Sequence, residues 1–188
     1  MVGYRAGYNE VGGWGQTFVG YEAAANITTG SHNTFIGYQA GGSSTTGQYN
    51  ICLGRAASPS SATASNECTL GDSNITSLRC NDTSISSLSD ARDKTDVVDL
   101  PTGLNFLNTL RPVKFKWATR DGNVKDGKIR SGFIAQELQE SQKDCDYLDL
   151  VMDNNPDRLE AKQENLIPVL VKAIQELSAE VKRLKNGS

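Results

Sequence analysis

A possible nucleophile and a possible base lie five residues apart in the run "SISSLSDARDKTD", residues 84–96. Ser89 supplies a hydroxyl and Lys94 an amine. A serine hydroxyl is a poor nucleophile near neutral pH and needs a base. A lysine amine can serve if burial lowers its pKa from about 10.4 towards about 7 to 8. Taken alone, such a pair is more commonly a helix-capping serine and a solvated lysine, so the surrounding chain must decide between the two interpretations.

The spacing of the pair also constrains the local backbone. Five residues on a regular helix would place the two side chains about 140° apart. If Ser89 and Lys94 act together, this segment must therefore form an irregular turn in which the long lysine stem folds back.

The chain before Ser89 is a repeat. Glycines recur every 17 residues, each preceded by an aliphatic residue, at Gly3, Gly20, Gly37, Gly54 and Gly71. A short fixed period of this kind indicates stacked supersecondary units, and the Gly, Thr, Ser and Asn content favours short strands and turns over helices. Flexible low-complexity chain is the alternative, but such a chain has no need of register. Because each repeat has little apolar surface, we expect several chains to wind around a common axis as an all-β stalk.

The density of charge changes abruptly at Ser89. The chain has 19 Lys and Arg and 22 Asp and Glu residues, of which only eight lie in residues 1–88. This change predicts a domain boundary, with a glycine-rich β segment over residues 1–88 and a second domain over residues 89–188.

The second domain has the pattern of a small α+β fold. The segment "TGLNFLNTL" predicts a short helix that ends before Pro112, and "PVKFKWA" alternates in the manner of a half-buried strand. A hairpin-type connection, "RDGNVKDGK", leads to a second predicted strand, "SGFIAQ", and "ELQES" is typical of the start of a helix.

The C-terminal residues have a heptad pattern that predicts a coiled coil over residues 165–185. Its a and d positions are Ile167, Leu170, Ile174, Leu177, Val181 and Leu184. The alternative is a lone amphipathic helix packed on its own domain. β-Branched residues at a with Leu at d favour two strands, so the seam indicates an oligomer without setting its number of chains.

Several classes of function are excluded by composition. The net charge of -3 predicts no nucleic-acid partner, and no apolar run approaches the roughly 18 residues that span a bilayer. We expect a soluble chain without membrane insertion and, since no basic and apolar leader opens it, without a secretion signal. Cys52, Cys68, Cys80, Cys145 and the single His32 lie too far apart to suggest a metal site, so neither metal nor cofactor is expected.

Four ordered motifs carry a resemblance to a known family: "LSDARDK", "LRPVKFKW", "GFIAQELQE" and "LIPVLVKAIQEL". Over residues 89 to about 185 the chain resembles the endosialidase-type intramolecular chaperone domain, a self-cleaving serine-lysine peptidase family found at the C-terminus of phage tail fibres and spikes. The repeats are similar to the glycine-punctuated stalk of trimeric viral fibres.

The resemblance implies specific roles for the motif residues. The domain would assemble three chains, fold the β-helix-like stalk in register, and cut once, in cis, between Leu88 and Ser89. Ser89 would be the nucleophile and Lys94 the base. Arg92, or backbone amides, could stabilise the oxyanion, and Asp90 could orient Lys94 or cap the following turn.

Two further residues lie in the "GFIAQE" motif. Gln136 and Glu137 could line the site in the assembled trimer, although a glutamate at a helix start is equally explained by the helix dipole.

The function that we expect is therefore that of a C-terminal fragment of a phage tail fibre, made in the host cytoplasm and assembled into the virion. It would be a homotrimer that meets a host surface receptor or glycan through the mature fibre. The alternative is an adhesive fibre tip whose C-terminal domain is a permanent trimerisation cap without proteolysis. A polysaccharide-degrading spike would need paired carboxylates, and the five acidic residues of the repeats are not close in sequence.

Overall fold

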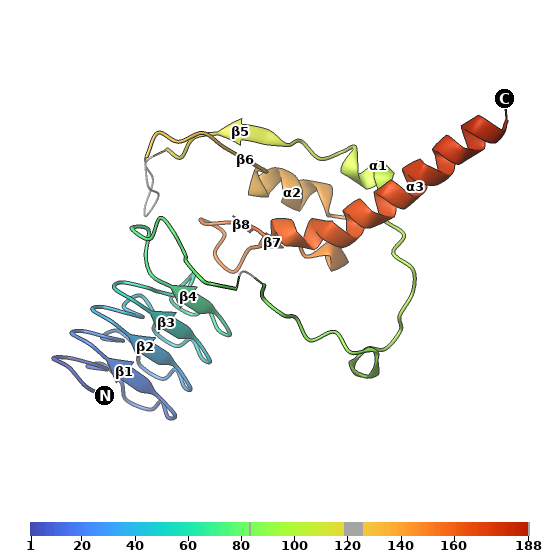
Figure 1. Ribbon diagram of the computed structural model, residues 1–188. Helices are drawn as coiled ribbons and strands as arrows, with labels where there is room; N and C mark the ends of the chain where they lie inside the picture. Colours follow the sequence, from blue (N-terminus) through green and yellow to red (C-terminus); the bar gives the residue numbers. More distant parts are fainter. Residues whose placement is uncertain (83, 119–125, 188) are drawn as a thin grey trace. The chain divides into compact units, whose positions relative to one another are not determined.

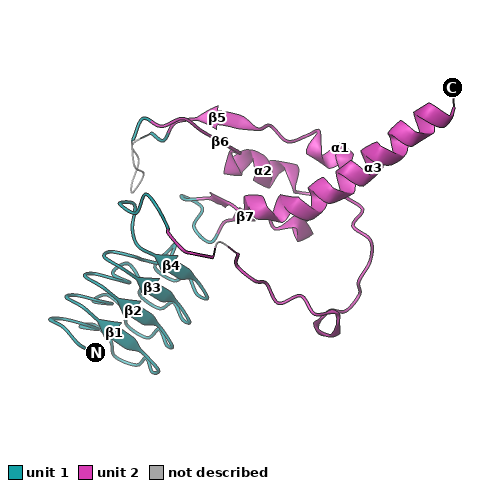
Figure 2. Ribbon diagram, in the orientation of Figure 1, with its two compact units in different colours: residues 1–78, 117–127, 154–158 teal, residues 79–116, 128–153, 159–188 magenta. Residues whose placement is uncertain are grey.

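The computed structural model describes residues 1–82, 84–118 and 126–187, and the chain forms two compact units (Figure 2). Unit 1 comprises residues 1–78, 117–127 and 154–158. Unit 2 comprises residues 79–116, 128–153 and 159–188. Residues 79–88, which precede the predicted domain boundary, thus lie in the same unit as the Ser89 segment.

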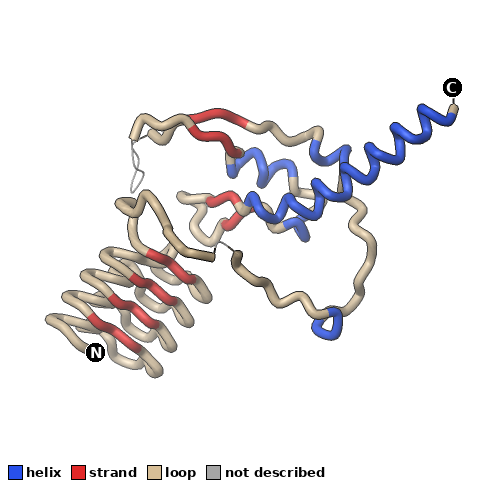
Figure 3. Tube along the Cα trace, viewed as in Figure 1, coloured by secondary structure: helices blue, strands red, loops and turns tan. Residues whose placement is uncertain are grey.

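The repeats of unit 1 form a parallel sheet with one short strand from each repeat (Figure 1, Figure 3). The strands are β1 (Thr17–Val19), β2 (Thr34–Ile36), β3 (Ile51–Leu53) and β4 (Cys68–Leu70). They pair in chain order, and each residue lies opposite the residue 17 positions further on, as Phe18 opposite Phe35. The sequence period is therefore the length of chain that returns each strand to its neighbour.

The core of unit 1 is built from equivalent positions of successive repeats. The middle residues of β1, β2 and β3 are turned inward, so Phe18, Phe35 and Cys52 are fully buried, and the rings of Phe18 and Phe35 stack 5.5 Å apart. The buried set is Phe18, Ala23, Ala24, Ile27, Phe35, Ala40, Cys52 and Ala57. A single chain thus has a small core of its own, and the winding of several chains around one axis stays a prediction.

Buried asparagines connect neighbouring repeats. The Asn33 side-chain amide donates to the Gly47 carbonyl at 2.8 Å, and that of Asn50 donates to the Ala64 carbonyl at 2.8 Å. The Asn33 side-chain oxygen in turn accepts from the backbone N–H of Asn50 at 2.9 Å. Because a buried amide is costly unless its hydrogen bonds are made, the 17-residue recurrence of asparagine has a structural cause.

The described residues of unit 2 form two small antiparallel strand pairs and three α-helices. The helices are α1 (Leu104–Leu107), α2 (Ala135–Ser141) and α3 (Leu166–Asn186), and single 3-10 turns are η1 (Ala91–Asp93), η2 (Asp146–Leu148) and η3 (Gln163–Asn165). The strand β5 (Val113–Phe115) pairs with β6 (Arg130–Gly132), and β7 (Val151–Met152) pairs with β8 (Glu160–Ala161). Leu138, Cys145, Leu148, Leu150, Val151, Leu166 and Val169 form its core.

One boundary in this unit differs from the sequence-based prediction. The strand expected over residues 131–136 ends at Gly132, because Ile134 already caps α2. The alternation of "SGFIAQ" does not continue as a strand to its end, because Ala135 and Gln136 belong to α2, the helix that buries Leu138. The predicted hairpin connection, residues 120–128, lies mostly outside the described residues.

The long helix α3 has two different apolar faces. Leu166, Val169 and Ala173 are buried in unit 2, and the Glu176 carboxylate accepts a hydrogen bond of 2.8 Å from the backbone N–H of Leu104 at the start of α1. The six heptad residues, by contrast, are exposed, from 42% for Val181 to 66% for Ile174. The heptad seam is thus not the face with which α3 packs on its own domain. Within the described ranges, no helix is long and apolar enough to cross a membrane.

Candidate functional site

Ser89 and Lys94 are in direct contact. The Lys94 Nζ donates a hydrogen bond of 2.6 Å to the Ser89 Oγ. The backbone between them forms the single 3-10 turn η1 and becomes extended again at Lys94, with φ -124° and ψ 140°. This short turn folds the lysine stem back over the serine, which a regular helix would not do.

Asp90 and Arg92, which lie between Ser89 and Lys94, form an ion pair with each other. The Asp90 carboxylate accepts from the Arg92 Nε at 3.0 Å and from its Nη2 at 2.6 Å, and also from the backbone N–H of Arg92 at 2.9 Å. These bonds hold the pKa of Asp90 below its ordinary value and raise the pKa of Arg92. Of the two roles considered for Asp90, the structure therefore shows it capping the turn, with its carboxylate bonded to Arg92 and not to Lys94.

The whole segment is open to water. Leu88 is 99% exposed, and Ser89, Asp90, Arg92 and Lys94 are exposed as well. A lysine ammonium must lose a proton before it can act as a base, and burial is the influence that favours this loss. A single chain provides the contact between the two groups but not the water-excluded surroundings.

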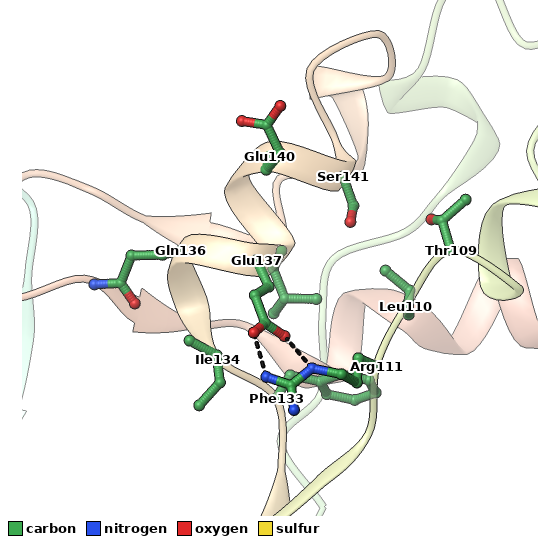
Figure 4. A pocket seen from close by; sticks show the side chains of 10 residues that line it. Thr109, Leu110, Arg111, Phe133, Ile134, Gln136, Glu137, Glu140 and Ser141 are labelled. Atoms are coloured by element: carbon green, nitrogen blue, oxygen red, sulfur yellow. Dashed lines mark hydrogen bonds and ion pairs between the residues drawn. The ribbon is translucent and has the colours of Figure 1, made fainter.

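Gln136 and Glu137 belong to a second group of residues, at the start of α2. They line a cleft of about 430 Å³ together with Thr109, Leu110, Arg111, Phe133, Ile134, Leu138, Glu140 and Ser141 (Figure 4). Glu137 accepts from the Arg111 Nε at 3.1 Å and also from its Nη2, and this pairing raises the pKa of Arg111. In Figure 4 the amide of Gln136 points away from this ion pair, so Glu137 is the member of the motif that faces Arg111.

The structure thus brings the predicted residues together in two groups. Ser89, Asp90, Arg92 and Lys94 share one exposed turn, and Gln136 and Glu137 share the cleft. No hydrogen bond or ion pair between described residues joins the two groups. Sequence reasoning missed Arg111, although it lies in the quoted motif "LRPVKFKW", because its partner is 26 residues away.

The residues considered for metal binding have other surroundings. Within residues 1–82, 84–118 and 126–187, no three His, Cys, Asp or Glu side chains gather as metal ligands. The His32 ring stacks on Tyr49 at 4.7 Å and meets the edge of Trp14 at 4.3 Å. All four cysteines are free, and burial raises the pKa of the Cys52 thiol to about 12.

One part of the chain matches a known protein family. Residues 89–147 match the model of a peptidase family described as chaperone of endosialidase. The match covers less than half of the chain, begins at Ser89 and includes Lys94, Arg111 and Glu137. No curated protein and no solved structure matches the chain. The match supports the family to which the sequence motifs pointed.

Proposed function

We propose that this chain is the C-terminal part of a phage tail fibre in which residues 89–188 are a self-cleaving intramolecular chaperone. Three copies assemble through this domain, promote folding of the repeats in residues 1–88, and then cut between Leu88 and Ser89. The observation that carries the proposal is the 2.6 Å contact of Lys94 Nζ with Ser89 Oγ, because Ser89 is also the first residue of the family match.

The reaction that these residues support is an acyl transfer followed by hydrolysis. The neutral Lys94 amine accepts the Ser89 hydroxyl proton as Oγ attacks the carbonyl carbon of Leu88. The bond from that carbon to the Ser89 nitrogen breaks, and the nitrogen takes up the proton from Lys94. Water then hydrolyses the ester, leaving a carboxylate at Leu88 and a free amine and hydroxyl at Ser89. Because the serine and the bond are tethered, no separate substrate has to be recruited.

The test is the mass of the purified chain under denaturing conditions. We expect two fragments that divide between Leu88 and Ser89, with Ser89 as the new N-terminus. A single uncut chain of 20.3 kDa would contradict the peptidase role.

A non-cleaving trimerisation cap on an adhesive fibre tip is the second candidate. The observation that favours it is the exposure of Ser89 and Lys94, because a catalytic pair is ordinarily enclosed and shielded from water. Both candidates require an oligomer, so only the cleavage test separates them.

Assembly through α3 makes a separate prediction. Its heptad residues are exposed in one chain, and packing them against other copies would remove apolar surface from water. We expect Ile174→Lys to reduce the native mass from three chains to one, because the charge would enter the seam. Ala179→Lys, at an exposed position outside the heptad seam of the same helix, should leave three chains. Native mass spectrometry of both variants decides this, and a parent of two chains would contradict the trimer.

A further inference from the structure

The cleft at the start of α2 has an apolar floor and a charged rim. Leu110 and Phe133 are partly buried against the core of unit 2, and Leu138 is 1% exposed. Arg111 and Glu137 pair at the rim, with side chains 66% and 42% exposed. The volume of about 430 Å³ lies in the range of about 300 to 1,000 Å³ that is usual for pockets with bound ligands. The cleft therefore suits an apolar side chain that is followed by charged groups.

The segment around the cleavage site has the complementary features. Leu88 is 99% exposed and lies in residues 84–90, which form neither a strand nor a helix. Two and four residues later come an acid and a base, Asp90 and Arg92, which pair only with each other at the described contacts. The reactive serine is thus preceded by an exposed leucine and followed by a local ion pair.

The charges of the two groups match when they are brought together. The rim presents a base, Arg111, and an acid, Glu137, whereas the segment presents the acid Asp90 and the base Arg92. Both pairs are solvent-exposed, and exposed ion pairs contribute little to stability, so exchanging partners costs little. In a covered interface, water and salt would screen the new pairs less.

We propose that this cleft is the docking site for the cleavage segment of a second copy of the chain, with Leu88 in the cleft, Asp90 on Arg111 and Arg92 on Glu137. The inference rests on the proposed function and deepens it by naming a specificity subsite and its occupant. In the single chain, no described hydrogen bond or ion pair joins the two groups although both lie in unit 2, and the exposed α3 seam provides the means to bring copies together.

Docking would also supply what the exposed turn lacks. Covering residues 88–94 removes water from the contact between Lys94 and Ser89, and loss of solvation favours the neutral amine. Leu88, Arg111 and Glu137 are accordingly positioning and specificity residues, while Ser89 and Lys94 perform the chemistry.

The first experiment reverses the rim charges without removing them. The double variant Arg111→Glu with Glu137→Arg keeps an ion pair within the cleft but presents the wrong charge to each residue of the segment. We expect cleavage to slow at least about tenfold, with an unchanged circular dichroism spectrum and native mass. If this pair were only structural, the reversed pair would cleave at the parent rate, and that result would overturn the proposal.

A second variant avoids any change in the cleft. Leu88→Asp replaces an almost fully exposed side chain, so it should not disturb the fold. On docking, however, it would place a carboxylate in the apolar cleft. We expect it also to slow cleavage at least about tenfold. Ile85→Asp is the matched control, since Ile85 is 97% exposed and lies three residues earlier, and should cleave at the parent rate.

Co-expression identifies which copy provides the cleft. One chain has Ser89→Ala and an intact cleft, and the other has Ser89 and the reversed rim. Cleavage of the second chain in mixed assemblies, above its rate alone, is expected for docking on a second copy. An unchanged slow rate would show docking within one chain and overturn the proposal. An uncut parent chain would overturn the proposed function and this inference together, whereas a cleaving parent with a fast reversed-rim variant would overturn the inference alone.

Discussion

The Ser89→Ala chain is expected to remain a single 20.3 kDa species under denaturing conditions, whereas the parent divides between residues 88 and 89. Without the Oγ atom no ester can form with the Leu88 carbonyl, so the loss should be complete and not partial. The substitution should not disturb folding, because Ser89 is exposed and its described side-chain contact is with Lys94.

The control for this variant lies two residues earlier. Ser87 is also an exposed serine of the same segment, and Ser87→Ala should cleave as the parent does. Cleavage of Ser89→Ala at the same bond would show that another group is the nucleophile. Lys94→Arg tests the base, since it keeps the positive charge but a guanidinium does not give up its proton in proteins. We expect this variant to stay uncut, and full cleavage would remove Lys94 from the role of base.

The stacking of the short strands in unit 1 follows directly from the 17-residue period of the sequence. Once the period is 17 residues, equivalent side chains must lie above one another, which accounts for the stacking of Phe18 on Phe35 and for the bonded pair of Asn33 and Asn50. The small core inside one chain could not be predicted, because it depends on how the turns bend to enclose Ile27 and the alanines.

In the candidate site, the local contact between Ser89 and Lys94 could be anticipated from sequence, whereas the ion pair of Arg111 and Glu137 could not. The turn between Ser89 and Lys94 follows from the local spacing of two residue types, and its contact is local. The ion pair of Arg111 and Glu137 joins residues 26 positions apart and depends on α2 starting at Ala135. Because the alternation in "SGFIAQ" suggested a strand through residue 136, the sequence placed Glu137 at the start of a later helix and gave Arg111 no partner.

Gly37→Ala is expected to cost unit 1 about 2 to 5 kcal/mol of folding free energy. Gly37 has φ +137°, a conformation that side-chain-bearing residues rarely adopt. An added Cβ would also lie 2.5 Å from the carbonyl oxygen of Gly54 and 2.6 Å from its carbonyl carbon, in the next repeat. Both atoms are backbone and cannot rotate away, so the two repeats would have to separate. Thermal unfolding followed by circular dichroism measures the loss.

Gly12→Ala is the matched control. Its added Cβ would have only the Thr29 Cγ2 nearby, at 3.9 Å, and its φ is not positive. The substitution should leave stability unchanged or raise it by up to about 1 kcal/mol through the unfolded chain. Equal melting temperatures for the two variants would contradict the close approach of the repeats at Gly37.

The same pair of variants separates folding of the repeats from cleavage. Ser89, Lys94 and the cleft around Glu137 all lie in unit 2, so a variant that destabilises unit 1 leaves the reacting groups in place. We therefore expect Gly37→Ala to divide between residues 88 and 89 at the parent rate although its repeats melt earlier. A loss of cleavage in Gly37→Ala, but not in Gly12→Ala, would mean that the cut depends on the folded repeats as well as on the assembled C-terminal domain.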